Sequence, residues 1–400
     1  MVIYNILKLY PIRSANPLRV LMICNTYMQV IISLQMKLKL YPDDEADIII
    51  SDHSIGADKV AEGLGKTGLF SRVKYVENYR ADYNTNRTEK LREIFRLFGG
   101  DSKYYGMLWD ENTIYDEICY YNTLRLVWAA FSKSVRDSKR EGREKIPVCN
   151  VFEEGIFCYD MVLSQILSMR KQFWKHRTVS LMHLFSVLSG RKDILGRSSN
   201  FICFHPEIID HAEEYKRAGF SFTKLPPLKP DENFLRILNT VFSYDPSGVK
   251  FPQKYIYFAT STDIDGNSVG ETELVLRLAD IVGRENLLVK MHPRDRRTVY
   301  RDNGLTVMEN SSVPWEVMQL NHDFSSHAFV SLSSGSVVNI MAMTGESIPS
   351  YFLYPMTKGR NKWLDHYSDG ISSSLKKLQA AGLCRSIKAV NTLEEAAGND

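Results

Sequence analysis

The segment Asn286-Leu-Leu-Val-Lys-Met-His-Pro-Arg-Asp295 joins a short apolar run to a histidine–proline pair. The apolar run predicts a buried strand, and proline lacks the backbone N–H that strand pairing requires, so the strand should end at His292-Pro293. The His292 imidazole is therefore expected at the carboxyl edge of a sheet, where open α/β sheets bind their ligands. Cationic side chains lie close by in the sequence, namely Lys290, Arg294, Arg296 and Arg297. This combination favours a ligand that carries phosphate, although the dipeptide alone is common and recurs at His205-Pro206.

Outward from this segment, short apolar runs alternate with helical patterns. Before residue 226, strands are predicted at residues 18–24, 46–51, 72–76 and 147–152. After residue 250, strands are predicted at residues 254–259, 286–291, 305–308, 328–331 and 348–353, and helices at residues 271–282 and 336–343. Strands that are apolar throughout indicate parallel pairing with helices on both faces of the sheet.

A proline-rich segment, Pro226–Pro230, separates the two alternating regions. The sequence therefore predicts an α/β protein of two domains, residues 1–228 and 251–400, joined by a linker at 229–250 that includes a helix at about 231–242. A length of 400 residues suits two domains of ordinary size.

Composition narrows the class of protein. Hydrophobic residues at 44% and charged residues at 24% are typical of a soluble globular chain, and a net charge of +3 gives no nucleic-acid signature. The six cysteines show no CxxC spacing, which favours free buried thiols in a reducing compartment over disulfides or zinc. No apolar run is long enough to span a membrane, and the first 17 residues lack a signal-peptide pattern, so we expect a cytoplasmic protein.

One basic and aromatic cluster, Arg170–Arg177, bears on membrane contact. A solvated loop or helix end is the simpler interpretation of this cluster. The alternative is peripheral contact with an anionic membrane surface, which would be the inner face of the cytoplasmic membrane.

The segment Val330-Ser-Leu-Ser-Ser-Gly-Ser336 predicts a strand that turns through small residues into a helix. Unpaired N–H groups at a helix start bind anions, Ser333 and Ser334 add hydroxyl groups, and Gly335 allows close approach of a phosphate. An ordinary serine-capped helix explains the same residues equally well. Because His292 should lie one sheet position away, phosphate binding is the better interpretation.

Two acidic segments could supply a general base. Glu153-Glu154-Gly155 follows the strand at 147–152, and adjacent residues point in different directions, so at most one of the two carboxylates should face a ligand. Asp263 and Asp265 follow the strand at 254–259 and compete for the same role, although aspartate–glycine loops are usually only turns. No complementary cluster of metal ligands accompanies them, and we expect no metal and no cofactor.

Several other motifs are absent from the sequence. The chain lacks a GxxxxGK[ST] phosphate loop, a GxGxxG after its first strand and an HExxH pair. A P-loop kinase, a Rossmann dehydrogenase and a zinc protease are therefore disfavoured.

The order Glu-Glu-Gly, His-Pro and Ser-Ser resembles the motifs of bacterial sialyltransferases and polysialyltransferases. The segments Ile23-Cys-Asn-Thr-Tyr-Met-Gln29 and Lys290-Met-His-Pro-Arg-Asp295 are most similar to glycosyltransferase family 52, which includes lipooligosaccharide sialyltransferases. The resemblance extends over about residues 18–353.

The resemblance implies a GT-B fold, in which two Rossmann-like domains with parallel sheets face each other across a cleft. It implies an N-terminal acceptor-side domain and a C-terminal domain that binds CMP-sialic acid. The activity would be a metal-independent, inverting transfer of sialic acid to a cell-surface glycan, lipooligosaccharide or capsule. Possible partners are thus a nucleotide-sugar donor and a glycan acceptor, without nucleic acid, and a homodimer is one option for the oligomeric state.

If the family's roles are carried over by position, His292 would hydrogen-bond to or protonate the CMP phosphate as it leaves. Glu154 or Asp265 would deprotonate the acceptor hydroxyl, and Glu153 is a further catalytic candidate in the acidic motif. The substrate-binding residues would be Ser333, Ser334, Gly335, Lys290, Pro293, Asn25 and Thr26. Two alternatives stay open: a GT-B transferase that uses another activated polyol or sugar such as CDP-glycerol, and a catalytically silent scaffold that binds nucleotide or glycan.

Overall fold

The computed structural model describes residues 17–79, 88–89, 92–93, 95–96, 103–109, 113–121, 124–143, 146–156, 158–159, 198–217, 219–292, 294–308 and 313–398. The chain divides into two compact units. The first contains Met1–Glu154 and Met161–Pro226, and the second contains Gly155–Asp160 and Pro227–Asp400. Among these described residues, no helix has both the length and the apolar character needed to cross a membrane.

The first unit is built on a seven-stranded parallel sheet in the order β3-β2-β1-β4-β5-β6-β7. Its strands are β1 Arg19–Cys24, β2 Glu45–Ser51, β3 Arg72–Val76, β4 Glu117–Tyr120, β5 Val148–Phe152, β6 Asn200–Cys203 and β7 Ser221–Lys224. Its helices are α1 Tyr27–Lys39, α2 Ala57–Thr67, α5 Lys103–Gly106, α6 Leu124–Arg140 and α10 Ala212–Arg217, with a 3₁₀ turn, η1, at Pro206–Ile208.

The central strands explain why this sheet is parallel. In β1 the residues from Val20 to Cys24 are all buried, and β2 is buried from Ala46 to Ser51. Side chains on both faces of a strand can be buried only if helices cover both faces of the sheet, which is the environment of parallel sheets. Helix α1 then begins where the Thr26 side chain accepts a hydrogen bond from the backbone N–H of Gln29.

The second unit is built on a six-stranded parallel sheet in the order β10-β9-β8-β11-β12-β13. Its strands are β8 Tyr255–Phe258, β9 Leu287–Lys290, β10 Thr306–Met308, β11 Ala328–Ser331, β12 Ser350–Phe352 and β13 Ile387–Ala389. Its helices are α11 Glu232–Phe242, α12 Glu271–Val282, α13 Val299–Asp302, α14 Trp315–Asn321, α15 Asn339–Thr344, α16 Lys362–Ala380 and α17 Leu393–Ala396. Short 3₁₀ turns lie at η2 Arg284–Asn286, η3 Gly335–Val337 and η4 Tyr354–Thr357.

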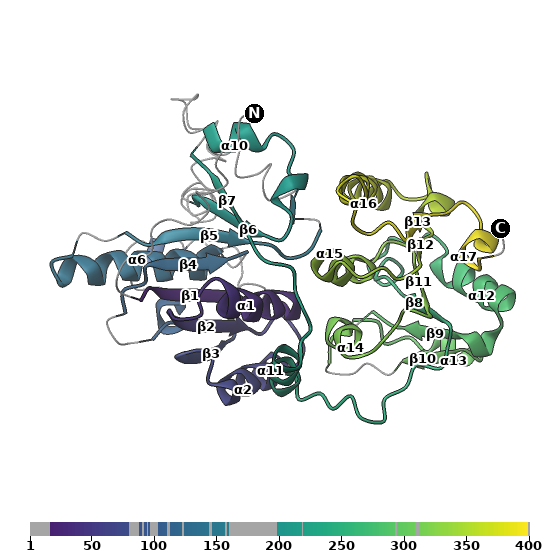
Figure 1. Cartoon of the computed structure of the whole chain (residues 1–400), viewed down its shortest axis with the longest axis horizontal. Helices are drawn as coiled ribbons and strands as arrows, with labels where there is room; N and C mark the ends of the chain where they lie inside the picture. The colour runs from purple at the N-terminus through teal and green to yellow at the C-terminus, as the bar shows by residue number, and fades with distance from the viewer. Residues whose placement is uncertain are drawn as a thin grey trace, which may run out of the picture. The chain divides into compact units, whose positions relative to one another are not determined.

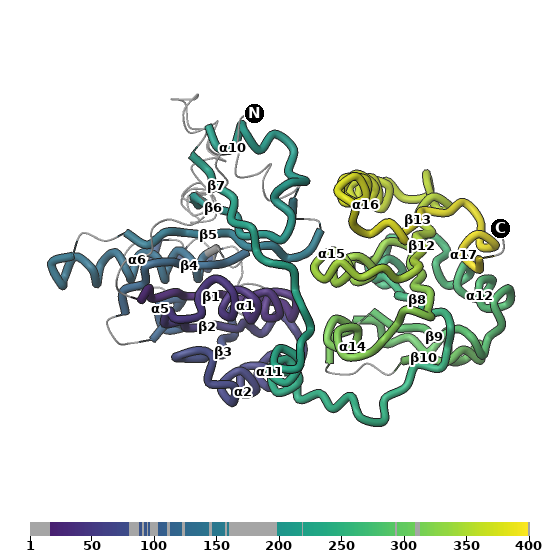
Figure 2. The backbone as a smooth tube through the Cα atoms, in the orientation of Figure 1, coloured from purple at the N-terminus to yellow at the C-terminus, as the bar shows by residue number. Residues whose placement is uncertain are grey.

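Helices cover both faces of this second sheet. Helices α12, α13 and α17 lie on one side, and α14 and α15 lie on the other (Figure 1). The range 229–250, which the sequence assigns to a linker, contains α11, and α11 packs against α14 within the second unit. Strands β8, β9 and β10 of this sheet can be found by their labels in Figure 2.

In both units the strand order reverses beside the first strand, between β1 and β4 and between β8 and β11. In open α/β sheets, ligands bind outside the carboxyl ends of the strands at such a reversal. The residues that follow β1, β8 and β11 are therefore the first places to look for a site.

All six cysteines are free and buried, which confirms the expectation of free buried thiols. Burial raises the pKa of the Cys24, Cys119 and Cys384 thiols. These thiols are thus protonated and poorly reactive.

Candidate active site

Three strands of the second unit end level with one another. Lys290 at the end of β9 pairs with Phe258 at the end of β8, and Phe258 pairs with Ser331 at the end of β11. The segments that carry His292 and the Ser333-Ser334 pair therefore leave the sheet at one edge. The sequence predicts that the strand before His292 is the direct neighbour of the strand before the serines. That expectation is wrong, because β8 lies between β9 and β11. The separation is two positions, because the strand order reverses at β8.

His292 is held by the arginine that follows it by two residues. The backbone N–H of Arg294 donates to Nδ1 of His292 at 3.2 Å, and the His292 carbonyl accepts from the N–H of Asp295 at 2.8 Å. Burial lowers the pKa of His292, and the nearby cations Arg294 and Lys290 lower it further. The imidazole is therefore neutral near pH 7, and because Nδ1 accepts a hydrogen bond, its proton resides on Nε2. Nε2–H is thus available as a donor to a ligand. Pro293 lies outside the described residues.

Lys290 is the last residue of β9, and burial lowers the pKa of its ammonium group. The Glu316 carboxylate, in the first turn of α14, opposes this effect and raises the pKa of Lys290. Glu316 Oε1 also accepts a hydrogen bond from the Ser336 hydroxyl at 3.2 Å. The Glu316 carboxylate thus lies near both Lys290, at the end of β9, and the serine-rich turn after β11. No sequence pattern marks Glu316 as a site residue, because only the folded chain brings α14 to these residues.

The serine-rich turn is fixed by its own hydroxyl groups. Ser331 donates to the Phe258 carbonyl at 2.8 Å and accepts from the backbone N–H of Ser334 at 3.0 Å. The Ser334 hydroxyl in turn accepts from the N–H of Ser336 at 3.4 Å, which caps η3. Ser333 is buried, at 3% exposed.

The helix predicted at 336–343 begins later in the structure, at Asn339. Gly335–Val337 form the 3₁₀ turn η3, and only Asn339–Thr344 form an α-helix, α15. Its six residues make a weak dipole, so a phosphate here would depend mainly on hydroxyl and backbone N–H groups.

The loop after β8 carries the two aspartates, and both pair with arginines. The two oxygens of Asp265 accept hydrogen bonds from the Arg294 guanidinium at 2.9 Å each. Hydrogen bonds from Ser261 and Arg294 lower the pKa of Asp265. Asp263 pairs with Arg297 at 3.2 Å and accepts from the Thr272 hydroxyl at 3.0 Å. Both carboxylates are therefore engaged, and the lowered pKa makes Asp265 a weak base. In the part of the chain that the structure describes, no group of three or more His, Cys, Asp or Glu side chains could hold a metal ion.

In the first unit, Glu153 and Glu154 differ sharply in environment. Glu153 is 2% exposed, and its Oε2 accepts from the backbone N–H of Phe204 at 2.8 Å, which ties the end of β5 to the residue after β6. Glu154 Oε1 accepts from the Thr26 hydroxyl at 2.6 Å. Burial raises the pKa of Glu154 to about 7, although the hydrogen bonds from Thr26 and Gln29 lower it. A carboxyl group with this pKa is suited to general base catalysis near neutral pH.

Asn25 and Thr26 follow β1, at the reversal of strand order in the first unit. The Asn25 N–H donates to Gln29 Oε1 at 2.6 Å, and Asn25 Oδ1 accepts from the Ser51 hydroxyl at 2.7 Å. These bonds fix the β1–α1 turn. The fold thereby places Thr26 against Glu154, a residue 128 positions further along the chain.

Gly155 completes the acidic motif and has a backbone φ of 89°, a conformation that favours glycine. A Cβ atom at this position would lie 2.6 Å from Oδ1 of Asn339. The same Oδ1 accepts a hydrogen bond from the backbone N–H of Ile156 at 3.3 Å. The glycine is therefore required by its conformation and by its close approach to α15, within the second unit.

The second His-Pro pair has a different environment. His205 is buried, its Nδ1 lies 3.1 Å from Glu207, and Glu207 also pairs with Lys224 at 3.1 Å. These contacts join η1 to β7 and account for the histidine without a ligand. The basic cluster Arg170–Arg177 lies outside the described residues.

No protein-family model matches the chain, and no curated protein matches it in sequence. Several solved structures resemble it. An α/β-galactoside α-2,3-sialyltransferase from the luminous marine bacterium Photobacterium phosphoreum is 13% identical, with a TM-score of 0.51 over 94% of this chain and 98% of that one. UDP-GlcNAc 2-epimerase from Methanocaldococcus jannaschii is 12% identical, with a TM-score of 0.51 over 95% and 91%. Arabidopsis thaliana UGT89C1, complexed with UDP-L-rhamnose, is 8% identical, with a TM-score of 0.50 over 96% and 89%.

At these identities the likeness establishes the fold. The chain has the α/β GT-B fold, which confirms the fold class predicted from the sequence. The three similar structures include a sialyltransferase and an epimerase, so the same fold serves different reactions. The reaction of this chain must therefore be argued from its site residues.

Proposed function

We propose that the chain is a glycosyltransferase that transfers sialic acid from CMP-sialic acid to a hydroxyl group of a cell-surface glycan, with inversion and without a metal ion. The order of the acidic, His-Pro and Ser-Ser motifs supports this donor. The GT-B fold, shared with the sialyltransferase of Photobacterium phosphoreum, supports a glycosyltransferase more broadly. A lipooligosaccharide or capsule acceptor would be met at the inner face of the cytoplasmic membrane.

The observation that carries the proposal is the bonding of His292. Its Nδ1 accepts from the Arg294 N–H, so Nε2–H is the donor, at the sheet edge that also carries Ser333 and Ser334. In sialyl transfer the bond between the anomeric carbon and the phosphate oxygen of CMP breaks, and the phosphate gains negative charge. A hydrogen bond from Nε2–H, together with the serine turn, would stabilise that charge. The phosphate would in turn raise the pKa of His292 and favour proton donation.

Glu154 is the better candidate for the base. The acceptor hydroxyl must lose a proton as its oxygen bonds to the anomeric carbon. Glu154 has a pKa raised to about 7, whereas Asp265 has a lowered pKa and is paired through both oxygens with Arg294. A single displacement of this kind inverts the anomeric centre.

The test is the release of CMP by the purified full-length chain. It should release CMP from CMP-sialic acid when lactose or a lipooligosaccharide fragment is present as acceptor. Glycosidic products identified by mass spectrometry would establish transfer rather than hydrolysis. Turnover of CDP-glycerol but not of CMP-sialic acid would instead favour a polyol-phosphate transferase, which also needs a histidine and a phosphate turn.

A further inference from the structure

Thr26 and Gln29 form a capping box at the start of α1 that departs from the usual pattern. A threonine at the N-cap followed three positions later by a glutamine is the signature of such a box. The Thr26 hydroxyl oxygen accepts from the backbone N–H of Gln29 at 3.3 Å, as the pattern requires. Gln29 Oε1, however, accepts from the backbone N–H of Asn25 at 2.6 Å, one residue before the N-cap. Both bonds use acceptor atoms, so the donor groups of the two side chains remain available for another partner.

The carboxyl group of Glu154 lies beside both donors. The Thr26 hydroxyl donates to Glu154 Oε1 at 2.6 Å. The Gln29 amide directs its Nε2 away from Asn25, because a backbone N–H can bond only to the amide oxygen. Gln29 is 0% exposed, and its Nε2 makes no well-aligned hydrogen bond with any residue that the structure describes. It nevertheless lowers the pKa of Glu154, so the buried amide lies next to a group that could accept from it.

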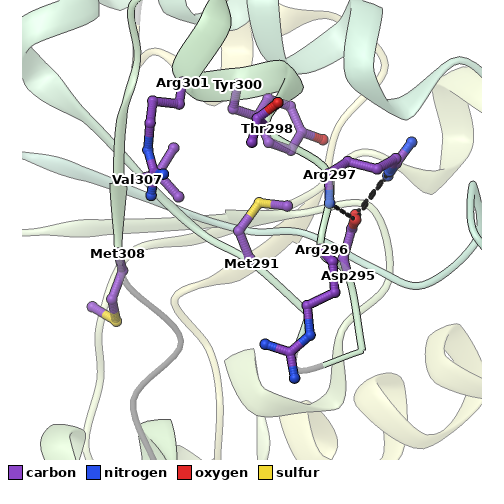
Figure 3. A pocket seen from close by; sticks show the side chains of 9 residues that line it. All are labelled: Met291, Asp295, Arg296, Arg297, Thr298, Tyr300, Arg301, Val307 and Met308. Atoms are coloured by element: carbon purple, nitrogen blue, oxygen red, sulfur yellow. Dashed lines mark hydrogen bonds and ion pairs between the residues drawn. The ribbon is translucent and has the colours of Figure 1, made fainter.

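Carboxylates in the second unit are held in a different way. Asp295 forms part of the wall of a cavity of about 270 Å³ and pairs with Arg297 at 2.6 Å (Figure 3). Burial raises the pKa of Asp295, but hydrogen bonds from Arg297 and its charge lower it below the usual value. Around Glu154 burial prevails instead, and the pKa is about 7. The ionisation of Glu154 therefore depends on how well its neutral donors bind it.

Two further titratable groups lie next to Glu154. Burial and the charge of Glu154 raise the pKa of the Cys24 thiol, at the end of β1, to about 12, although the Ser33 hydroxyl lowers it. That thiol is therefore neutral near pH 7. Glu153 precedes Glu154, and its Oε2 is bound to the backbone N–H of Phe204. Neither group supplies a positive charge to Glu154.

We propose that Gln29 is a positioning residue for Glu154: its Nε2–H donates to the ionised carboxylate and, with the Thr26 hydroxyl, holds that carboxylate in one orientation. A buried N–H without an aligned acceptor costs free energy, and an ionised carboxylate is a stronger acceptor than a neutral carboxyl group. Ionisation of Glu154 thus supplies the acceptor that the amide lacks. The first turn of α1 contains no acidic residue, and the partial positive charge of the helix start favours the same ionised form.

The consequence for catalysis rests on the proposed function, in which Glu154 is the base. The contacts of Gln29 themselves lie within the first unit and do not depend on that function. A base must be ionised at the working pH, and burial alone would leave Glu154 protonated there. Gln29 would therefore keep the pKa of the base within reach of neutral pH.

Titration of the Glu154 carboxyl group in the full-length protein tests the proposal without turnover. Glutamate labelled with ¹³C at the side-chain carboxyl carbon reports ionisation by NMR, and Glu154→Gln identifies the Glu154 signal. Gln29→Met keeps the length of the side chain and removes the donor. It should raise the pKa of Glu154 by about one pH unit, a tenfold change in proton affinity, because a hydrogen bond to a charged group contributes at least that much. The pH at which kcat rises should increase by the same amount.

Gln35→Met is the matched control. Gln35 lies on the same helix, is 1% exposed, and donates from Nε2 to the Pro226 carbonyl at 2.9 Å. This variant also removes a buried amide from α1, but the pKa of Glu154 should stay at about 7. The thermal midpoints of the two variants show whether they disturb the helix equally.

Gln29→Glu is a second variant, informative even if Gln29→Met disrupts the turn. It keeps an oxygen atom for the Asn25 N–H but replaces the donor with a second carboxyl group. Because like charges disfavour ionisation, it should raise the pKa of Glu154 more than Gln29→Met does.

An upward shift in both Gln29 variants, with none in Gln35→Met, would support the proposal. An unchanged pKa of Glu154 in a folded Gln29 variant would overturn it, and so would an equal shift in Gln35→Met. Failure of the proposed function would appear separately, as a wild-type protein that releases no CMP although the Gln29 variants still shift the titration of Glu154.

Discussion

Both carboxylate oxygens of Asp265 accept hydrogen bonds from the guanidinium group of Arg294, each at 2.9 Å. The backbone N–H of the same arginine donates to Nδ1 of His292. One residue therefore links the loop after β8 to the imidazole after β9. We therefore propose that Asp265 positions His292 through Arg294 and does not serve as the base.

Replacing Asp265 with asparagine tests this assignment. Asp265→Asn removes the charge of the bidentate pair and should lower kcat/KM about tenfold, which corresponds to roughly 1.4 kcal/mol. The dependence of kcat on pH should keep its wild-type shape, because the base is unchanged. A loss of a thousandfold or more, together with a changed pH profile, would assign the base to Asp265.

Glu154→Gln should have a far larger effect. Loss of a general base typically lowers kcat by about 10²–10⁴-fold. Because the pKa of Glu154 is about 7, its ionised form increases as pH rises through 7, so wild-type kcat should rise across pH 6–8. That rise should be absent in Glu154→Gln. A wild-type profile that is flat over this range would contradict the role of Glu154.

Thr26→Val provides an independent test of the same group. The Thr26 hydroxyl donates to Glu154 and lowers its pKa, so removing it should raise the pKa further. The rise in kcat should then move to higher pH while the plateau at high pH stays close to wild type. A shift to lower pH would show that the hydrogen bond does not act on the catalytic carboxylate.

His292→Ala should abolish turnover and weaken CMP binding by a smaller factor. The imidazole acts mainly on the charge that develops as the phosphate leaves, so its loss affects the transition state more than the bound ground state. Steady-state kinetics and calorimetry with CMP measure the two effects. His205→Ala is the control, since that histidine pairs with Glu207 and should leave both quantities unchanged. Equal losses in turnover and affinity would indicate a binding role for His292 instead.

Gly155→Ala should destabilise the protein strongly. The substitution introduces strain at a φ of 89° and places Cβ 2.6 Å from Asn339 Oδ1. Gly345→Ala has a similar φ of 80° but meets no atom within 4 Å, so it isolates the strain of about 1–2 kcal/mol. In denaturant unfolding, Gly155→Ala should cost more than Gly345→Ala. Adding Asn339→Ala should recover part of the difference, and no recovery would show that the close contact carries no energy.

Buried strands could be predicted from the sequence because their apolar runs are continuous. The predicted ranges 72–76 and 328–331 coincide with β3 and β11, and the other predicted strands differ from the observed ends by one or two residues. The short strands β4, β6, β7 and β13 were not predicted. Strand β7, with the sequence SFTK, lies at the sheet edge and has no fully buried residue. Its extended conformation depends on pairing with β6, which periodicity does not encode.

The sequence could predict that each site residue follows the carboxyl end of a strand, but not which of these residues the fold brings together. Each site residue could be placed after a strand, since prolines, glycines and serines mark where strands end. The strand order, which places β8 between the strand before His292 and the strand before the serines, depends on how the crossovers pack. The pairs Thr26–Glu154 and Arg294–Asp265 join residues 128 and 29 positions apart, and no local pattern signals them.

The segment Gly155–Asp160 belongs to the second unit, although the first unit supplies the residues on both sides of it. The second unit is therefore not one continuous stretch of sequence. A fragment that begins at Pro227 would lack the backbone of Gly155 and Ile156 that meets Asn339. Chimaeras that exchange the second unit between proteins of this fold would need to carry this hexapeptide along with the contiguous segment that begins at Pro227, or the grafted unit would lose part of its own packing.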